Sequence, residues 1–181
     1  MIYKSLESCV NDLEKNGHLI RVKEEVDPYL EMAEIQRRVY QAQGPALLFT
    51  NVKGSKFRCV SNLFGTMDRT RFMFRSTLEG VKKLVDLKVD PTRALKHPLK
   101  YTSVALTALK TLPRKQITSN FESCRIQDLP QILSWPDDGG AFVTLPQVYT
   151  EHPDFPGTRL SNLGMYRIQL SGNQYKPNEE I

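Results

Sequence analysis

The residues of this sequence that are best suited to chemistry lie near its carboxyl end, in the run from Met165 to Leu170. Apolar and polar residues alternate along this run, which is typical of a half-buried strand. Alternation gives such a strand two faces, one with Met165, Arg167 and Gln169 and the other with Tyr166, Ile168 and Leu170. The second face can join a core while the first lines a cavity. Arg167 would then present a planar guanidinium, which can hold a carboxylate through two parallel hydrogen bonds.

Asn162 is the second candidate in this region, because a carboxamide oxygen is a neutral hard ligand that suits a hard cation. It lies five positions before Arg167, so alternation places the two side chains on opposite faces unless Gly164 bends or bulges the backbone. On spacing alone, a cap or turn role for Asn162 is favoured over a ligand role. Arg167 could equally be an exposed charge on an edge strand.

A Pro/Asp/Gly turn that leads into a short apolar strand precedes these residues, from Trp135 to Thr144. Its two carboxylates, Asp137 and Asp138, are predicted to form a turn rather than a metal site. Trp135 is predicted to fill a core or an interface. The three histidines of the chain stand in unrelated contexts without a second ligand at metal spacing, so the sequence gives no support for a histidine metal centre.

The carboxyl-terminal run resembles the UbiD family of prenylated-FMN-dependent decarboxylases, whose pattern is an Asn, then Gly-aliphatic-Tyr-Arg and a Gln one or two residues later. This chain supplies the pattern with Asn162, Gly164, Met165, Tyr166, Arg167 and Gln169. The amino-terminal half is similar to the family in Asp12-Leu13-Glu14, Gly17-His18-Leu19-Ile20-Arg21-Val22, Val26-Asp27-Pro28 and Gly44-Pro45-Ala46-Leu47-Leu48-Phe49. The resemblance is to the amino-terminal portion of a family member, and it rests on the order and spacing of all these pieces.

The resemblance implies a role for each residue of the run. Asn162 corresponds to a ligand of a divalent metal, manganese, that clamps the phosphate of prenylated FMN, with potassium as a further candidate cation. Met165, Tyr166 and Arg167 correspond to residues that contact the flavin, and Arg167 also to the catalytic arginine that orients the substrate carboxylate. The family's histidine and glutamate ligands and its catalytic acid would lie beyond Ile181, so we expect this portion alone to be inactive and not to retain the cofactor.

The implied reaction is the reversible removal of carbon dioxide from an aromatic or α,β-unsaturated carboxylic acid, such as 3-polyprenyl-4-hydroxybenzoate in ubiquinone or menaquinone biosynthesis. The cofactor would carry the difficult step while protein groups position and protonate. The resemblance also implies a homo-oligomer for the full-length protein. The alternative is a flavin-binding split-barrel module without decarboxylase chemistry.

Composition narrows the classes of partner and compartment. The chain has 181 residues, a net charge of +5 and a pI near 9.1, but 25 basic residues against 20 acidic ones is a modest excess. The densest basic stretch, residues 82–114, alternates with apolar residues as a solvated helical face does, so no nucleic-acid partner is predicted. Three widely spaced cysteines argue against a disulfide framework. Since no signal peptide and no apolar span of about 18 residues is found, we expect a cytoplasmic protein without a transmembrane segment.

Helix and strand signals alternate in the first half of the chain, which favours an α/β unit. Ser5 can cap a helix that stops at Gly17, and Asp27-Pro28 opens a second helix that Gly44-Pro45 terminates. Strands are predicted over residues 19–22, 46–50 and 59–63, and further helices over 68–75, 78–87 and 102–112.

From Gln116 onward the sequence changes to short β-type runs divided by Pro, Gly and Asp. The predicted fold class is therefore α/β (α+β), with an amino-terminal α/β domain over residues 1–114. Residues 115–181 are predicted to be the first strands of a flavin-binding split β-barrel domain of the flavin-reductase-like type. That domain is expected to be truncated, because the return strand after Gly172-Asn173 would have only a few residues.

Overall fold

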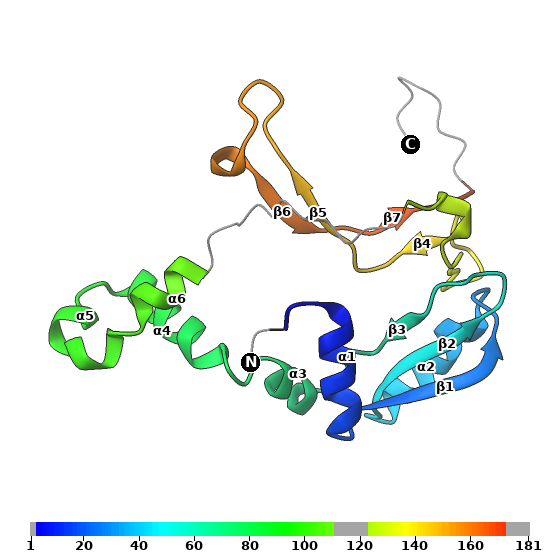
Figure 1. The fold of residues 1–181 in the computed structure, drawn as a ribbon, viewed down its shortest axis with the longest axis horizontal. Helices are drawn as coiled ribbons and strands as arrows, with labels where there is room; N and C mark the ends of the chain where they lie inside the picture. The colour runs from blue at the N-terminus through cyan, green and yellow to red at the C-terminus, as the bar shows by residue number, and fades with distance from the viewer. Residues whose placement is uncertain (1–2, 111–122, 173–181) are drawn as a thin grey trace.

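The first half of the chain is built on a three-stranded sheet, as a computed structural model that describes residues 3–110 and 123–172 shows (Figure 1). Strands β1 (Leu19–Val26) and β2 (Ala46–Val52) are parallel, and β3 (Cys59–Ser61) pairs antiparallel with β2, so that the order is β1-β2-β3. A parallel pair needs a crossover connection. Helix α2 (Glu31–Gln41) supplies it, which confirms the mixed α/β class.

Strand β2 is the centre of the core because both of its faces are covered. Ala46 and Leu48 pack with residues of helix α1 (Leu6–Lys15) in one cluster, which includes Leu13. Leu47 and Phe49 point the other way and pack with Met32 of α2 and with Val26 and Val52 in a second cluster. This strand is therefore a continuous apolar run, as expected for a strand that is buried on both faces.

Helix α1 begins as the sequence predicts. The Ser5 hydroxyl accepts a hydrogen bond from the Ser8 amide at 3.2 Å, and the Ser8 hydroxyl receives the Ser5 amide in return. The helix ends at Lys15, followed by Gly17 with φ +74°, a left-handed conformation that glycine adopts without a steric penalty.

The start of α2 differs from the prediction that Asp27-Pro28 opens it. The Asp27 carboxylate accepts the amide of Tyr29 at 2.9 Å and so forms a local turn, and the helix begins only at Glu31. The Leu133 amide donates to the Pro28 carbonyl at 3.1 Å, and the Leu30 amide donates to the Leu133 carbonyl at 3.0 Å. This tertiary contact explains the delay, because residues paired with a distant segment cannot join the first helical turn.

A helical region follows the sheet and confirms the predicted helices. It contains α3 (Met67–Met73), α4 (Leu78–Val89), α5 (Arg93–Lys96) and α6 (Val104–Lys110), with a short 3-10 turn at Pro98–Tyr101. The end of the helix predicted to reach residue 112 lies outside the described residues. In the part of the chain that the structure describes, no helix is long and apolar enough to cross a membrane.

The second half contains two small antiparallel sheets. Strands β4 (Phe142–Val143) and β7 (Ile168–Gln169) form one pair, and β5 (Gln147–Thr150) and β6 (Asn162–Met165) form the other. This half contacts the first through the Leu133 bonds described above and through the Ser55 hydroxyl, which donates to the Asp128 carbonyl at 2.7 Å. The short β-type runs are confirmed. The predicted domain boundary between residues 114 and 115 and the hairpin after Gly172-Asn173 fall outside the described residues, and the split barrel stays a prediction.

A half-buried carboxylate ties the amino terminus and the end of α3 to helix α1. The Tyr3 hydroxyl donates to Asp12 at 2.6 Å and Arg75 Nη2 lies 2.7 Å from the same oxygen. The hydrogen bond from Tyr3, followed by that from Arg75, holds the pKa of Asp12 below its ordinary value of 3.8. A depressed pKa in the folded state contributes stability that is present above the unfolded pKa and lost as pH falls through the folded value.

We therefore expect Asp12→Asn to lower the free energy of unfolding by about 1–2 kcal/mol at neutral pH, with a difference that disappears as pH falls below about 4. Urea unfolding at pH 7 and pH 3 measures this difference. Asp68→Asn is the matched control, since the Asp68 side chain is 91% exposed. An equal loss of stability at both pH values would show that the carboxylate charge is not the cause.

Candidate functional site

The chain changes its pairing partner within the predicted site. Strand β6 ends at Met165 and pairs with β5, whereas β7 begins at Ile168 and pairs with β4, so Tyr166 and Arg167 lie between two strands. The prediction of one continuous alternating strand is therefore wrong. Its supposed core face is open as well, since Tyr166 is 51% and Ile168 41% exposed.

Arg167 is held at this break by two contacts with the preceding turn and strand. Its Nη2 lies 2.6 Å from Oδ2 of Asp138, and its guanidinium carbon lies 3.6 Å from the centre of the Phe142 ring. The Asp138 side chain is only 12% exposed, while that of Arg167 is 43% exposed. Arg167 is thus a positioned arginine, and the interpretation as a free edge charge does not hold. Sequence reasoning recognised the Asp138 turn but not the ion pair.

Hydrogen bonds across strands β4 and β7 fix the turn that carries Asp138. Gln169 Nε2 donates to the carbonyls of Gly139 (3.1 Å) and Ser171 (3.0 Å). Gly140 has φ +155°, and a Cβ there would lie 1.8 Å from the Ser171 carbonyl oxygen, so only glycine fits. The Gly-Gly pair therefore permits the close approach of the two strands that places Asp138 beside Arg167.

Asn162 stands at the start of β6, opposite Thr150, and its Nδ2 donates to the Tyr166 hydroxyl at 3.2 Å. The Tyr166 ring folds back over Gly164, whose imaginary Cβ would lie 2.6 Å from the ring. The β5–β6 register continues through Gly164, so the expected bend at that glycine is wrong and the break falls after Met165. The structure brings Asn162 and Tyr166 together, but no hydrogen bond joins Asn162 to Arg167 among the described residues.

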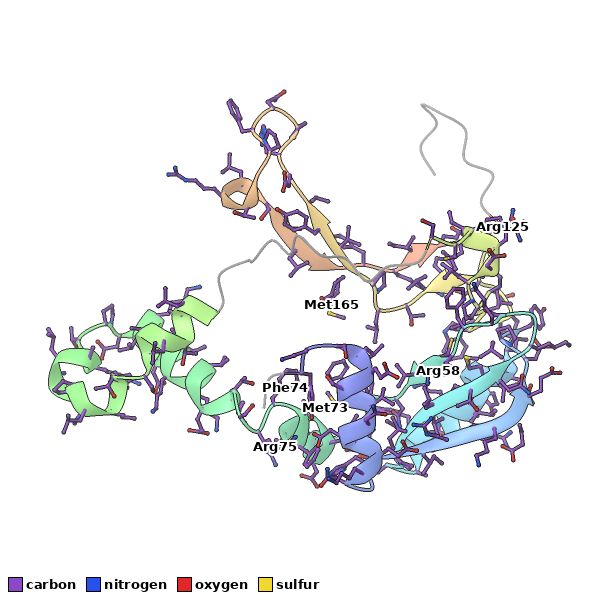
Figure 2. The ribbon with its side chains drawn as sticks, viewed as in Figure 1. Arg58, Met73, Phe74, Arg75, Arg125 and Met165 are labelled. Atoms are coloured by element: carbon purple, nitrogen blue, oxygen red, sulfur yellow. The ribbon has the colours of Figure 1, made fainter. Side chains whose placement is uncertain are left out.

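The flavin contact predicted for Met165 falls on an exposed residue. The Met165 side chain is 57% exposed and extends from the ribbon of strands β5 and β6 (Figure 2). Thus Met165 and Tyr166 both offer accessible surface on either side of the strand break, next to Asn162 and Arg167 in the chain.

The donor chemistry of Asn162 fits a metal ligand, but not a complete site. Its carboxamide oxygen accepts no hydrogen bond from residues 3–110 or 123–172, because only its nitrogen is engaged, with Tyr166. No group of three or more His, Cys, Asp or Glu side chains that could hold a metal occurs in that same part of the chain. One amide cannot bind a metal ion by itself, so further ligands would have to come from elsewhere.

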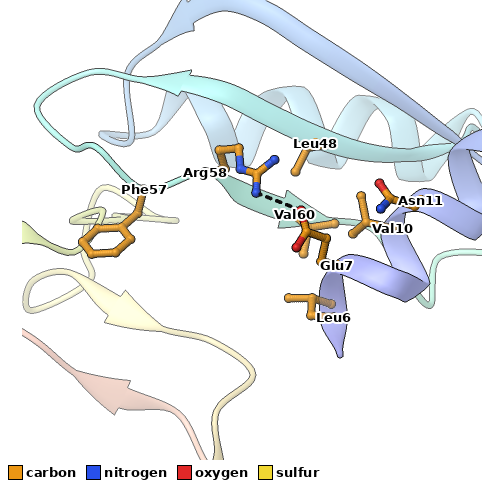
Figure 3. Close-up of a pocket in the computed structure, with 8 residues that line it drawn as sticks. All are labelled: Leu6, Glu7, Val10, Asn11, Leu48, Phe57, Arg58 and Val60. Atoms are coloured by element: carbon orange, nitrogen blue, oxygen red, sulfur yellow. Dashed lines mark ion pairs between the residues drawn. The ribbon is translucent and has the colours of Figure 1, made fainter. Parts of the chain in front are cut away.

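Two grooves lie away from Arg167. The first, about 300 Å³, runs between α1 and the sheet; Leu48, Val60 and Leu6 line it, and Glu7 and Arg58 form an ion pair across it at 3.6 Å (Figure 3). It contains none of the predicted site residues. The second, about 430 Å³, lies between α2 and Trp135. Since Trp135 is 60% exposed, the prediction that it fills a core is wrong.

Comparison with known proteins gives this arrangement its family. Residues 10–88 match the 3-octaprenyl-4-hydroxybenzoate carboxy-lyase N-terminal domain, and residues 108–177 match the Rift-related domain of the same enzyme. A protein of Chlamydia pneumoniae described as a 4-hydroxybenzoate decarboxylase component is 42% identical over 156 residues, which cover 83% of this chain and 26% of that protein. The chain belongs to the UbiD family.

Solved structures agree at the level of the fold. Vanillic acid decarboxylase of Sedimentibacter hydroxybenzoicus in its open form superposes with a TM-score of 0.67 at 24% identity, over 93% of this chain and 36% of that one. An evolved dimeric form of the UbiD-class enzyme HmfF from Pelotomaculum thermopropionicum, in complex with prFMN, gives 0.64 at 22% identity, over 94% and 36%. The chain spans only 26–35% of the length of five curated relatives that it matches.

Proposed function

We propose that this chain is the amino-terminal portion of a UbiD-class carboxy-lyase. The complete enzyme, by which we mean this chain joined to the carboxy-terminal part that its relatives possess, would reversibly decarboxylate an aromatic or α,β-unsaturated carboxylic acid such as 3-polyprenyl-4-hydroxybenzoate. The observation that carries the proposal is the held guanidinium of Arg167, of which one terminal nitrogen is engaged by Asp138. Its remaining donors match the planar geometry of a carboxylate.

Each site residue has a distinct part in this proposal. Arg167 binds and orients the substrate carboxylate, and a bidentate grip can fix the angle between the carboxylate and the rest of the molecule. Asn162 offers its carboxamide oxygen to a manganese ion that would hold the phosphate of prenylated FMN. Met165 and Tyr166 provide an apolar and an aromatic surface against the flavin. When bound, that cofactor supplies the electron sink for decarboxylation.

The carboxy-terminal part would supply what the chain lacks for chemistry, namely the other metal ligands and the acid that protonates the product. We expect the 181-residue chain alone to catalyse no carboxyl exchange when supplied with prenylated FMN and manganese. The complete enzyme should exchange labelled bicarbonate into a panel of aromatic and unsaturated acids. If it binds flavin but exchanges no acid in the panel, the alternative of a flavin-binding module is the better description.

Replacing Asn162 tests the metal role separately from activity. We expect Asn162→Ala in the complete enzyme to purify with less than a tenth of the wild-type manganese and flavin, because the phosphate loses a ligand of its counter-ion, and outer ligands of metal sites already change affinity by about 10–100-fold. Metal analysis and the flavin absorbance measure this loss. Asn11→Ala, at an exposed amide on α1, is the matched control. Full metal and flavin in Asn162→Ala would exclude Asn162 as a ligand.

We further propose that the complete enzyme is a homo-oligomer. The dimeric form described for one related structure supports this proposal. Light scattering of the complete enzyme would test it, and a single monomeric species at micromolar concentration would contradict it.

A further inference from the structure

The Asp138 carboxylate makes a contact in the site that the proposed roles leave unexplained. It lies in a turn closed by its own amide, which donates to the Trp135 carbonyl at 3.1 Å. Its side chain is 12% exposed and points at Arg167, whereas the neighbouring Asp137 is exposed and its side chain has no hydrogen bond or ion pair within the described residues. Two adjacent carboxylates thus have different surroundings, and only one of them faces the arginine.

Two contacts of different kinds fix the plane of the Arg167 guanidinium. The hydrogen bond from Nη2 to Asp138 lies at its edge, and the Phe142 ring covers one face at 3.6 Å. Arginine has five N–H donors in a rigid fork. Within the described residues only Nη2 has an acceptor, so Nε and Nη1 are left for a second anion. Arg167 can therefore be shared between Asp138 and one ligand carboxylate.

We infer that Asp138 is a positioning residue that acts as the permanent counter-ion of Arg167 during decarboxylation. The inference rests on the proposed function, since it names a second partner for the same arginine. Asp138 holds the guanidinium through one nitrogen and presents the others to the substrate carboxylate. It also keeps the arginine charge compensated after that carboxylate has left.

The reason lies in the charge change of the reaction. When the bond between the carboxylate and the substrate carbon breaks, its electron pair stays with the carbon, carbon dioxide leaves as a neutral molecule, and a proton later takes its place. An arginine paired with the substrate alone would stabilise the ionised ground state and lose its partner in the transition state, which slows the step. It would also be left as an uncompensated charge in a closed site. A fixed second anion reduces both costs.

Asp138→Asn separates charge from position, because the amide oxygen can still accept the Arg167 hydrogen bond. In the complete enzyme we expect kcat to fall about tenfold or more, in the range found when partners of functional side chains are replaced. The KM for the acid should stay equal or fall, since the substrate then has Arg167 to itself. Asp138→Glu should recover part of kcat. Asp137→Asn, the matched control at the preceding position, should leave both constants unchanged.

Two results would overturn the inference. One is an Asp138→Asn enzyme with the kinetic constants of Asp137→Asn. The other is a loss of kcat that comes with an equal loss of bound flavin or of folded protein, which would indicate a purely structural role.

Failure of the proposed function can be told apart from failure of the pairing. If the complete wild-type enzyme decarboxylates no acid, the proposed function falls and with it the catalytic part of the inference. The pairing itself is then judged on the 181-residue chain by a double-mutant cycle of Asp138→Asn and Arg167→Gln in thermal unfolding. Non-additive shifts in Tm support the ion pair, and additive shifts contradict it.

Discussion

Replacing Arg167 with lysine in the complete enzyme is expected to lower kcat/KM by about 10²–10³-fold, the loss typical for removing one well-placed donor from a catalytic site. Lysine keeps the positive charge and can still pair with Asp138, so folding should hardly change. It lacks the planar fork, however, and its single ammonium cannot hold Asp138 and orient a substrate carboxylate at the same time. Steady-state decarboxylation kinetics with the flavin content measured on the same sample would test this expectation.

Arg159→Lys provides the control for Arg167→Lys. Arg159 is an exposed arginine in the short 3-10 turn Thr158–Leu160, and its guanidinium has no partner within the described residues. We expect wild-type kinetics for that variant. Wild-type turnover by Arg167→Lys with a full complement of flavin would show that Arg167 does not orient the substrate, whatever its contact with Asp138.

Local signals in the sequence predict much of the fold correctly because short-range physics decides those elements. The Ser5 cap and the Gly17 stop of α1 depend on residues that are neighbours in the chain. The apolar run of β2 indicates a strand covered on both faces, and the structure covers it with α1 and α2. The start of α2 is missed because the distant Leu133 holds the segment before Glu31 by backbone pairing.

The site is predicted only in part, for a similar reason. Residue types and spacing identify Asn162 and Arg167 as candidates, but the geometry depends on which strands they join. The exchange of partner after Met165 and the Asp138–Arg167 pair follow from contacts between distant parts of the sequence, 29 positions apart for that pair. A strict period of two has no means of showing that Tyr166 and Arg167 fall between strands.

The largest effect on stability is expected from Arg69, a buried cation whose guanidinium is held by backbone carbonyls. Arg69 is 2% exposed, and it donates to three of them, those of Leu63, Gly44 and Asn62. Burial lowers the pKa of Arg69, yet an arginine remains charged at neutral pH. Its three bonds join α3 to the turn that ends α2 and to the loop after β3, so one side chain holds three segments in place.

We expect Arg69→Met to lower the free energy of unfolding of the 181-residue chain by about 3–5 kcal/mol. Methionine keeps much of the apolar stem but leaves three carbonyls without a donor, and each unsatisfied buried group costs about 1–3 kcal/mol before relaxation. Urea unfolding followed by circular dichroism would measure the loss. Arg71→Met is the control, because Arg71 lies on the same helix with a 66% exposed side chain and should change stability by no more than about 0.5 kcal/mol. Equal stability of the two variants would mean that water reaches the three carbonyls and that Arg69 does not anchor the loop.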